Sequence, residues 1–357
     1  MIDKIVELSK ELLSIPSTED KPEALKKALN LLKNEVKDYT VEEFEHNGSH
    51  SILAYKGSGR PDKFRVILNG HIDVVPGEES QYKPIEENGK LHARGAYDMK
   101  AAATVMTMVF RDVANQLKYP LALQIVTDEE VGGRNGTKYQ IEQGIRGDFV
   151  IAGEASNLQL SYKSKGLMTV KVSFHGSTAH AAYPWNGKSA IWRMKHFLDK
   201  LEEKFPIPKT ETWKTTVNVA QVHTSNTTIN KVPADCTLML DVRYISEDQD
   251  TIEDDLKSCL SDGGHLEVVS RDSAHFTNQE NPFVVALQNA AERVTGIVPP
   301  FIAKHGASDL RHYDKVDCPA VLFGPVGAGL HSDEEWVEIK SLEDYYFILK
   351  DFLLGLN

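Results

Sequence analysis

Residues 64–73 read FRVILNGHID, and residues 121–130 read LALQIVTDEE. Each stretch is a short apolar run that ends in side chains able to bind a metal ion or move a proton: His71 and Asp73 in the first, Glu129 and Glu130 in the second. Short apolar runs are typical of strands buried on both faces, as in a parallel sheet. Sites in open α/β sheets form at the carboxyl ends of strands, so the two stretches predict both the sheet and its site.

Three further segments add ligand-type residues. Glu154 follows FVIAG (149–153), His331 follows the glycine-rich GPVGAG (324–329), and Asp98 precedes a predicted helix in ARGAYDMK (93–100). Two imidazoles and several carboxylates form a ligand set suited to zinc or a similar divalent ion. Each oxygen of a carboxylate can bind one ion, so a bridging role between two metals is open to Asp98.

Taken singly, each segment also has a simpler explanation. The HID sequence fits a structural His–Asp pair, Asp98 fits a helix N-cap, and Glu129–Glu130 fits a solvated acidic turn. Against the last reading, adjacent carboxylates repel each other unless a cation is near. Their side chains also point differently, so one can ligate a metal while the other faces a bound water. The joint occurrence of all these segments favours a two-metal hydrolase site over unrelated structural roles.

The composition limits the class of protein and of partner. The 357 residues hold 40 Lys and Arg against 52 Asp and Glu, a formal charge of −12, which disfavours nucleic acid or an anionic membrane as the partner. The first 17 residues read as an amphipathic helix with acidic residues rather than a signal peptide. No apolar run approaches the ~18 residues of a membrane span, so we expect a cytoplasmic protein. The three scattered cysteines are expected to be reduced and structural.

The order of helix and strand patterns predicts two domains. Helices alternate with short buried strands over residues 1–164 and 274–357, which indicates an α/β domain with a mostly parallel sheet. Residues 165–273 instead give the order βαββαβ, an α+β ferredoxin-like unit. We therefore expect a catalytic domain that binds the metals, with an inserted domain whose exposed edge strand or helix face invites pairing with a second copy.

Five segments in combination resemble those of the dinuclear zinc peptidase and deacylase family, which includes succinyl-diaminopimelate desuccinylase, acetylornithine deacetylase, aminoacylase and glutamate carboxypeptidase. The resemblance covers the whole chain, and the segments are GHIDVVP (70–76), ARGAYDMK (93–100), TDEEVGG (127–133), GEAS (153–156) and GAGLHSDEE (327–335).

The resemblance implies a role for each site residue. His71 and Glu154 would hold one metal, Glu130 and His331 the other, and Asp98 would bridge the two metals. The peptide bond between Asp98 and Met99 would be cis. Glu129 would be the general base. Asp73 would orient His71 through its second ring nitrogen, as is usual for metal-bound histidine.

Further matches concern the substrate. In STAHAAYPWNGKSA (177–190), His180 matches the residue that reaches the partner subunit's site and stabilises the oxyanion; a lone loop histidine is otherwise usually solvated. Asn230 in NKVPAD and Arg243 in DVRY match positions that hold substrate, and their simpler readings are a turn asparagine and a surface strand arginine. HGASDLR resembles a segment of the desuccinylases, which makes Arg311 a candidate for binding the substrate carboxylate through a bidentate pair.

The resemblance favours a metal-dependent hydrolase that cleaves the amide bond of N-acyl amino acids, as succinyl-diaminopimelate desuccinylase and acetylornithine deacetylase do. The expected cofactors are two divalent ions, zinc first, with cobalt or manganese as alternatives. The expected assembly is a homodimer, in which the inserted domain of residues 165–273 is the dimerisation element and acts as a lid. A carboxypeptidase or dipeptidase of the same family is the alternative. A non-catalytic homologue that binds amino acids is a more remote one, because no ligand and no general base is missing.

Overall fold

In the computed structural model, which describes residues 1–356, the chain forms two compact units. The first holds Met1–Lys163, Phe276–Ala303 and the chain from Ser308 onward, and the second holds Ser164–His275 with Lys304–Ala307. Each unit is built around its own apolar core. The catalytic and lid roles expected for the two domains stay predictions.

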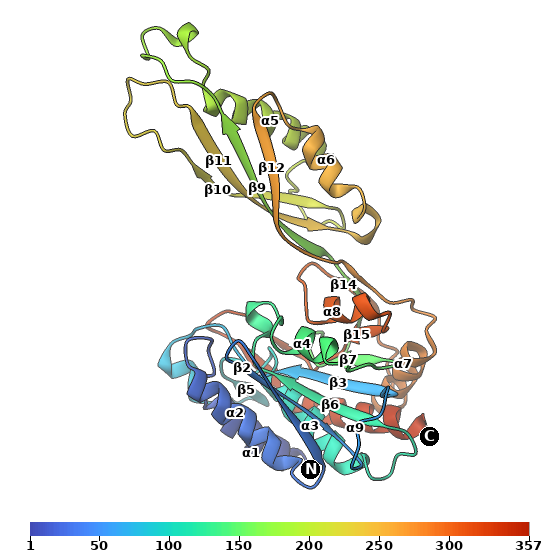
Figure 1. The fold of residues 1–357 in the computed structure, drawn as a ribbon. Coiled ribbons are helices and arrows are strands. Elements are labelled where there is room, and N and C mark those ends of the chain that lie inside the picture. The colour runs from blue at the N-terminus through green and yellow to red at the C-terminus, as the bar shows by residue number, and fades with distance from the viewer. Residues whose placement is uncertain (357) are drawn as a thin grey trace. The chain divides into compact units, whose positions relative to one another are not determined.

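The first unit is built on a large sheet, shown with its helices in Figure 1. The strand order is β1-β2-β6-β3-β7-β15-β8-β13, with β14 beside β8. The strands at the centre, β6, β3, β7 and β15, pair in parallel, whereas β1, β2 and β8 add antiparallel edges. The strands span β1 Thr40–His46, β2 Ser49–Tyr55, β3 Val66–His71, β6 Leu121–Val126, β7 Val150–Ala152, β8 Leu160–Ser164, β13 His275–Phe276, β14 Phe301–Lys304 and β15 Ala320–Leu322.

Helices cover both faces of this sheet, which is why β3, β6 and β7 are buried along their whole length. One face carries α1 (Ile2–Leu13), α2 (Pro22–Glu35), α3 (Lys100–Val113), α7 (Pro282–Thr295) and α9 (Ile339–Gly355). The other carries α4 (Thr137–Glu142) and α8 (Leu310–Tyr313). Helix α3 contacts α1, α9 and β3, so nearly all of its apolar residues are buried. The predicted α/β domain is confirmed.

A second, small sheet was not predicted. It has the order β16-β17-β5-β4, with β4 Ile85–Glu87, β5 Lys90–His92, β16 Gly327–Ala328 and β17 Trp336–Glu338. Strands of two or three residues leave no periodic pattern in a sequence, which explains the omission. The antiparallel pair β17–β5 joins the segment that precedes Asp98 to the segment that follows His331.

The second unit has the predicted order βαββαβ. Its elements are β9 (Gly166–His175), α5 (Ala190–Lys204), β10 (Thr216–His223), β11 (Asp235–Tyr244), α6 (Ile252–Ser258) and β12 (Gly264–Asp272). The strands form one antiparallel sheet of order β10-β11-β9-β12. Alternate residues of β9, from Met168 to Phe174, face a core shared with both helices, as period-two patterning predicts.

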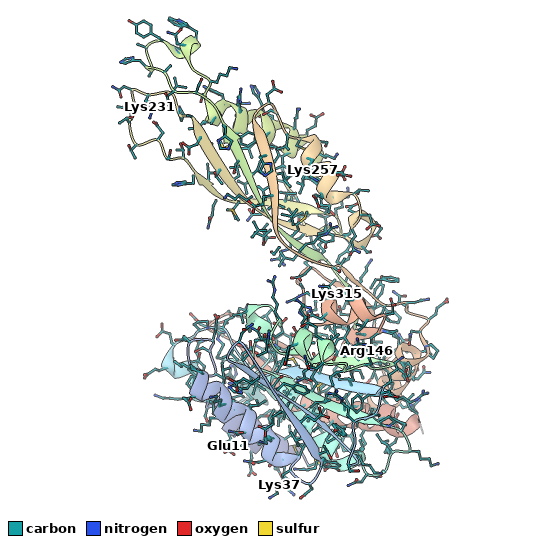
Figure 2. All side chains as sticks on the ribbon, in the orientation of Figure 1. Glu11, Lys37, Arg146, Lys231, Lys257 and Lys315 are labelled. Carbon is teal, nitrogen blue, oxygen red and sulfur yellow. The ribbon has the colours of Figure 1, made fainter. Side chains whose placement is uncertain are left out.

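Many charged side chains lie on the outside of both units. Figure 2 labels examples on helices, Glu11 of α1 and Lys257 of α6, both exposed. Single turns of 3₁₀ helix occur at Glu79–Tyr82, Glu129–Val131, Pro184–Asn186, Ser246–Asp248 and Asp314–Val316. Across residues 1–356, no helix has both the length and the apolar character that a membrane crossing requires. The expected cytoplasmic location stays a prediction.

The core of the first unit gives a stability prediction. Phe149, the residue directly before β7, is fully buried, stacks on Phe283 with ring centroids 5.2 Å apart and contacts Phe352 with ring centroids 6.3 Å apart. Phe149→Ala is expected to lower the free energy of unfolding by ~3–5 kcal/mol, because the cavity it leaves cannot fully collapse. Urea denaturation followed by far-UV circular dichroism measures this. Phe347→Ala, at a side chain 42% exposed, is the matched control, and an equal loss in both would contradict the packing described.

Candidate metal centre

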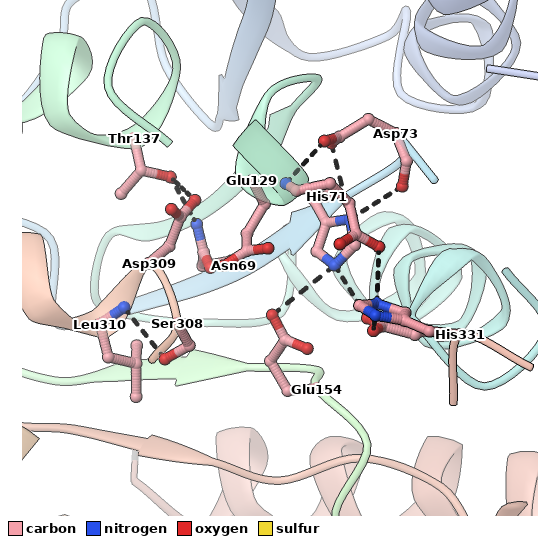
Figure 3. Close-up of polar contacts among 12 residues, drawn as sticks. Asn69, His71, Asp73, Glu129, Thr137, Glu154, Ser308, Asp309, Leu310 and His331 are labelled. Carbon is pink, nitrogen blue, oxygen red and sulfur yellow. Dashed lines mark hydrogen bonds and ion pairs between the residues drawn. The ribbon is translucent and has the colours of Figure 1, made fainter. Parts of the chain in front are cut away.

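Three of the predicted ligands follow adjacent parallel strands. His71 is the last residue of β3, Glu130 lies in the 3₁₀ turn after β6, and Glu154 comes two residues after β7 ends. Since β6, β3 and β7 are neighbours, their carboxyl ends meet at one edge of the sheet. Asp98 and His331 reach the same edge from loops, and Figure 3 shows the cluster that results.

The first group of donors surrounds His71, which is 2% exposed. Its Nε2 lies 3.0 Å from Oδ1 of Asp98 and 3.7 Å from Oε1 of Glu154. The second group surrounds His331, whose Nε2 lies 3.2 Å from Oδ2 of Asp98 and 3.2 Å from Oε1 of Glu130. The two oxygens of Asp98 therefore face two different groups, which is the arrangement that a bridging carboxylate needs.

Both groups fit a divalent cation. Each offers one imidazole nitrogen and two carboxylate oxygens, all within 4.8 Å of one another. Zinc accepts this set of donors, and other positions in the ligand sphere stay open, as in catalytic rather than structural sites. The backbone of His331 has φ 58°, in the left-handed region that non-glycine residues rarely adopt. Such conformations persist at functional sites, where the surroundings impose them.

The electrostatics of the cluster also favour a bound cation. Burial, with the charge of Asp98, raises the pKa of Glu154 to about 8. Burial, with the charge of Glu154, raises the pKa of Glu129 well above its usual range. Burial alone would raise the pKa of Asp98 as well, but hydrogen bonds from His331 and His71 hold it below its usual range. Hydrogen bonds to Asp98 and to Glu130 raise the pKa of His331 to about 10. A cation relieves this repulsion.

Asp73 contacts one residue of each donor group, His71 and Glu130. His71 Nδ1 lies 3.0 Å from the carbonyl oxygen of Asp73 and 3.5 Å from its carboxylate Oδ1. The other carboxylate oxygen accepts a hydrogen bond of 2.9 Å from the backbone N–H of Glu130. The position agrees with the role expected for Asp73, which stays a prediction, and adds a contact to Glu130 that the sequence did not indicate.

The peptide bond between Asp98 and Met99 is cis, as expected from the resemblance.

Glu129 and Arg311 lie at the border of the cluster. Arg311 is 5% exposed and donates hydrogen bonds of 2.8 Å to the carbonyl oxygens of Ser308 and Gly132, while its Nη1 is 3.9 Å from Oε1 of Glu129. His312 Nε2 is 3.1 Å from the same Gly132 carbonyl. Arg311 therefore contributes to holding the turn that carries Glu129 and Glu130; its contact with a substrate carboxylate stays a prediction.

Other buried polar residues around the cluster received no role from the sequence. Asp128 accepts a hydrogen bond of 2.7 Å from the backbone of Asn135, and Asp309 accepts one of 2.5 Å from Thr137. Burial and the charge of Asp309 raise the pKa of Asp128 to about 7. Both lie in motifs that the sequence singled out, TDEE and HGASDLR. Their place in these motifs was a signal that could have marked them as site residues. Nothing else in the sequence distinguished them from solvated acidic residues.

The remaining site residues belong to the second unit. The exposed loop of His180 pairs with the exposed loop of Asn230, because the N–H of Ala181 donates to the Asn230 carbonyl at 2.9 Å. These two side chains therefore lie on neighbouring segments. Arg243 forms a two-pronged ion pair with Asp241, at 2.7 and 3.0 Å. The substrate and oxyanion roles expected for these residues stay predictions.

Comparison with known proteins extends these observations. The sequence profile described as Peptidase family M20/M25/M40 matches residues 67–355. Aminopeptidase PepT from Bacillus cereus is 19% identical, with a TM-score of 0.81, and 100% of this chain and 99% of that chain are covered. A tripeptidase from Staphylococcus aureus is 21% identical, with a TM-score of 0.80 over 100% and 98% of the two chains. The metallo-carboxypeptidase Sso-CP2 from Sulfolobus solfataricus is 18% identical, with a TM-score of 0.78 over 98% of each. At these identities the likeness shows the fold.

His312 gives a pH prediction. Burial, with the nearby charge of Arg311, lowers the pKa of His312 to about 3, whereas an unfolded histidine titrates near ~6.5. Between these values the unfolded chain binds a proton that the folded chain does not, so stability falls as the pH is lowered. From pH 6.5 to 4.5, His312 should account for a loss of about 2–3 kcal/mol.

Urea denaturation of metal-free protein at the two pH values measures this loss. His312→Gln removes the titrating group, so its free energy of unfolding should depend less on pH than that of the parent protein. His265→Gln, at an exposed histidine, should keep the parental dependence. Equal slopes for the parent and His312→Gln would show that His312 is not held neutral.

Proposed function

The chain belongs to peptidase family M20/M25/M40, and on that premise we propose that it cleaves the amide bond of a small substrate with a free carboxylate. The substrate is an N-acyl amino acid, with short peptides as the second candidate. The observation that carries the proposal is the placement of Asp98, whose two oxygens face the two donor groups. A carboxylate shared in this way has little purpose unless two cations are bound together.

Each donor group would hold one divalent ion. His71 and Glu154 would complete one site and His331 and Glu130 the other, with Asp98 common to both. Zinc suits these nitrogen and oxygen donors best, and cobalt or manganese tolerate the same set. When bound, such a pair of ions polarises the substrate carbonyl and lowers the pKa of water.

The side chains around the ions would supply the proton chemistry. Glu129 takes a proton from the attacking water as the new carbon–oxygen bond forms, and it delivers this proton to the leaving nitrogen as the carbon–nitrogen bond breaks. Its position next to Glu130 on one 3₁₀ turn supports this role, because one carboxylate ligates while its neighbour faces the water. Asp73 fixes the orientation of the His71 ring throughout.

Different observations support the two substrate classes. The HGASDLR segment, with Arg311, and the glutamate at position 154 resemble the deacylases, which favours N-acetyl or N-succinyl amino acids. The solved structures with similar folds are named as an aminopeptidase, a tripeptidase and a carboxypeptidase, which favours short peptides as the second candidate.

A hydrolysis screen separates the two classes. N-acetyl and N-succinyl amino acids are assayed beside dipeptides and tripeptides, with added zinc, cobalt or manganese. Turnover of acyl amino acids supports the first candidate, and turnover of peptides alone supports the second. A protein that binds both metals but hydrolyses neither class would contradict the proposed function.

The second unit supports a homodimer. Strand β10 lies at the edge of its sheet, and the side chains of Val219 and Val222 there are 37% and 58% exposed. On helix α5, Ile191 and Trp192 are 38% and 65% exposed. An unpaired apolar strand edge favours isologous pairing with a second copy. In such a dimer the unit would act as a lid, and His180 would serve the partner's site by stabilising the oxyanion.

Glu129→Gln tests the general base. The variant should keep both metals, because Glu129 is not among the five proposed ligands, while turnover should fall by at least ~10²–10⁴-fold. Metal content by atomic emission and initial rates measure the two effects. Glu280→Gln, an exposed glutamate, is the control and should match the parent. Near-parental rates for Glu129→Gln would assign the base to another group.

Mixing two inactive variants tests the dimer. His180→Ala should lose ~10²–10³-fold in turnover, as typical for an oxyanion donor. When His180→Ala chains are mixed with Glu129→Gln chains under exchange conditions, activity should return, because one site of each heterodimer has its own Glu129 and the partner's His180. If subunit exchange is demonstrated but no activity returns, His180 does not act across the dimer.

A further inference from the structure

Glu335 is a buried carboxylate that is not among the proposed metal ligands, and it accepts a hydrogen bond from the backbone of Asp98, the proposed bridging residue. Glu335 follows His331 by four residues, at the start of the segment that leads into β17, and is 3% exposed. It belongs to the same acidic run as Glu334, which is exposed. A buried carboxylate is unfavourable unless hydrogen bonds or an opposite charge compensate it, so its partners indicate what it does.

Four donors surround the Glu335 carboxylate, and all come from the loop that carries Asp98. Oε2 accepts hydrogen bonds from the guanidinium of Arg94 at 3.1 Å and from the N–H of Gly95 at 3.0 Å. Oε1 accepts from the N–H of Tyr97 at 2.9 Å and from the N–H of Asp98 itself at 3.0 Å. The carboxylate thus accepts four hydrogen bonds, from four of the five residues 94–98.

These bonds satisfy a backbone that has few other partners. Residues 94–98 have no regular secondary structure, and Gly95 has φ 81°. Buried N–H groups without acceptors are costly, so the loop depends on an acceptor from outside. A simple ion pair would require Arg94 alone. The three backbone bonds, the last of them at the proposed bridge, go beyond what charge compensation needs.

Glu335 also joins the two loops that complete the site. Its main-chain carbonyl accepts a hydrogen bond of 3.2 Å from Ala93, and β17 directly after it pairs with β5 directly before the loop. One residue thus fixes the loop of Asp98 against the segment of His331. The two proposed ligands that these segments carry lie 3.2 Å apart, between Nε2 of His331 and Oδ2 of Asp98.

We propose that Glu335 is a positioning residue that holds the backbone of residues 94–98, so that Asp98 presents one oxygen to each metal. It touches neither the metals nor the substrate, and it acts through Asp98. This inference rests on the proposed function, because it assumes that Asp98 bridges two ions. It predicts that removing the acceptor weakens metal binding at both sites together, since both share Asp98.

Glu335→Gln tests this with little change in size. The amide nitrogen cannot accept hydrogen bonds, so two of the four donors lose their partner. Titration of the apo protein with cobalt ion alone, followed by its visible absorption, should show affinity reduced by ~10–100-fold, the usual effect of losing a partner behind the ligands. With a substrate from the screen, kcat should fall by a similar factor while KM changes little. Glu334→Gln, the exposed neighbour, is the matched control and should bind cobalt as the parent does.

A merely structural role would give a different result. Glu335→Gln would then lower the melting temperature of the apo protein, but its folded fraction would bind cobalt with the parental affinity and spectrum, which would overturn the proposal. If the parent itself binds no cobalt pair, the proposed function fails instead, so the two failures are distinguishable.

Glu335→Asp is the second variant, in case Glu335→Gln does not fold. It keeps the charge but shortens the side chain by one methylene. Its cobalt affinity should therefore lie between that of Glu335→Gln and that of Glu334→Gln. Parental affinity and kcat in Glu335→Asp would contradict the proposal. Failure of both variants to fold would show that Glu335 serves the fold rather than the bridge.

Discussion

Mutual repulsion among buried carboxylates is the constraint on which the site depends. Asp98, Glu130 and Glu154 lie within a few ångströms of two imidazoles at one edge of the sheet, and Glu129 lies beside them. Burial disfavours the charged forms of these groups and strengthens their repulsion, which is why the pKa of Glu154 rises to about 8. A fold that keeps these groups together without a cation incurs a large electrostatic cost. Two bound cations would remove that cost, and in the proposed function the same cations would supply the chemistry of amide hydrolysis.

The fold meets this constraint with two kinds of support. The parallel strands β6, β3 and β7 are held by their ladders, so the ligands that follow them are placed by the sheet itself. Asp98 and His331 are carried by loops, and the chain fixes these loops with hydrogen bonds from buried groups. Glu335 holds the first loop and joins it to the second, while Arg311 and His312 hold the turn of Glu129 and Glu130 through the Gly132 carbonyl.

The position of the site residues that follow strands could be predicted from the sequence pattern, whereas the position of those carried by loops could not. Apolar runs before His71, Glu129 and Glu154 placed them at one sheet edge. Nothing periodic placed Asp98 or His331 there. Their residue types marked them as candidate ligands, and the resemblance assigned each of them to its metal. The contacts of Glu335 depend on strands of two or three residues, which leave no pattern, and its HSDEE segment reads as a solvated acidic run. The roles proposed for His180, Asn230 and Arg243 depend on contacts that no local pattern encodes.

The bridge is the central claim, and anomalous diffraction from crystals grown with zinc tests it most directly. Data collected on both sides of the zinc absorption edge locate the ions without reference to the protein. Two peaks are predicted, ~3.5–4 Å apart, as in known two-metal sites. One should lie between His71 and Oδ1 of Asp98 and the other between His331 and Oδ2. A single peak, or two peaks that do not share Asp98, would contradict the account.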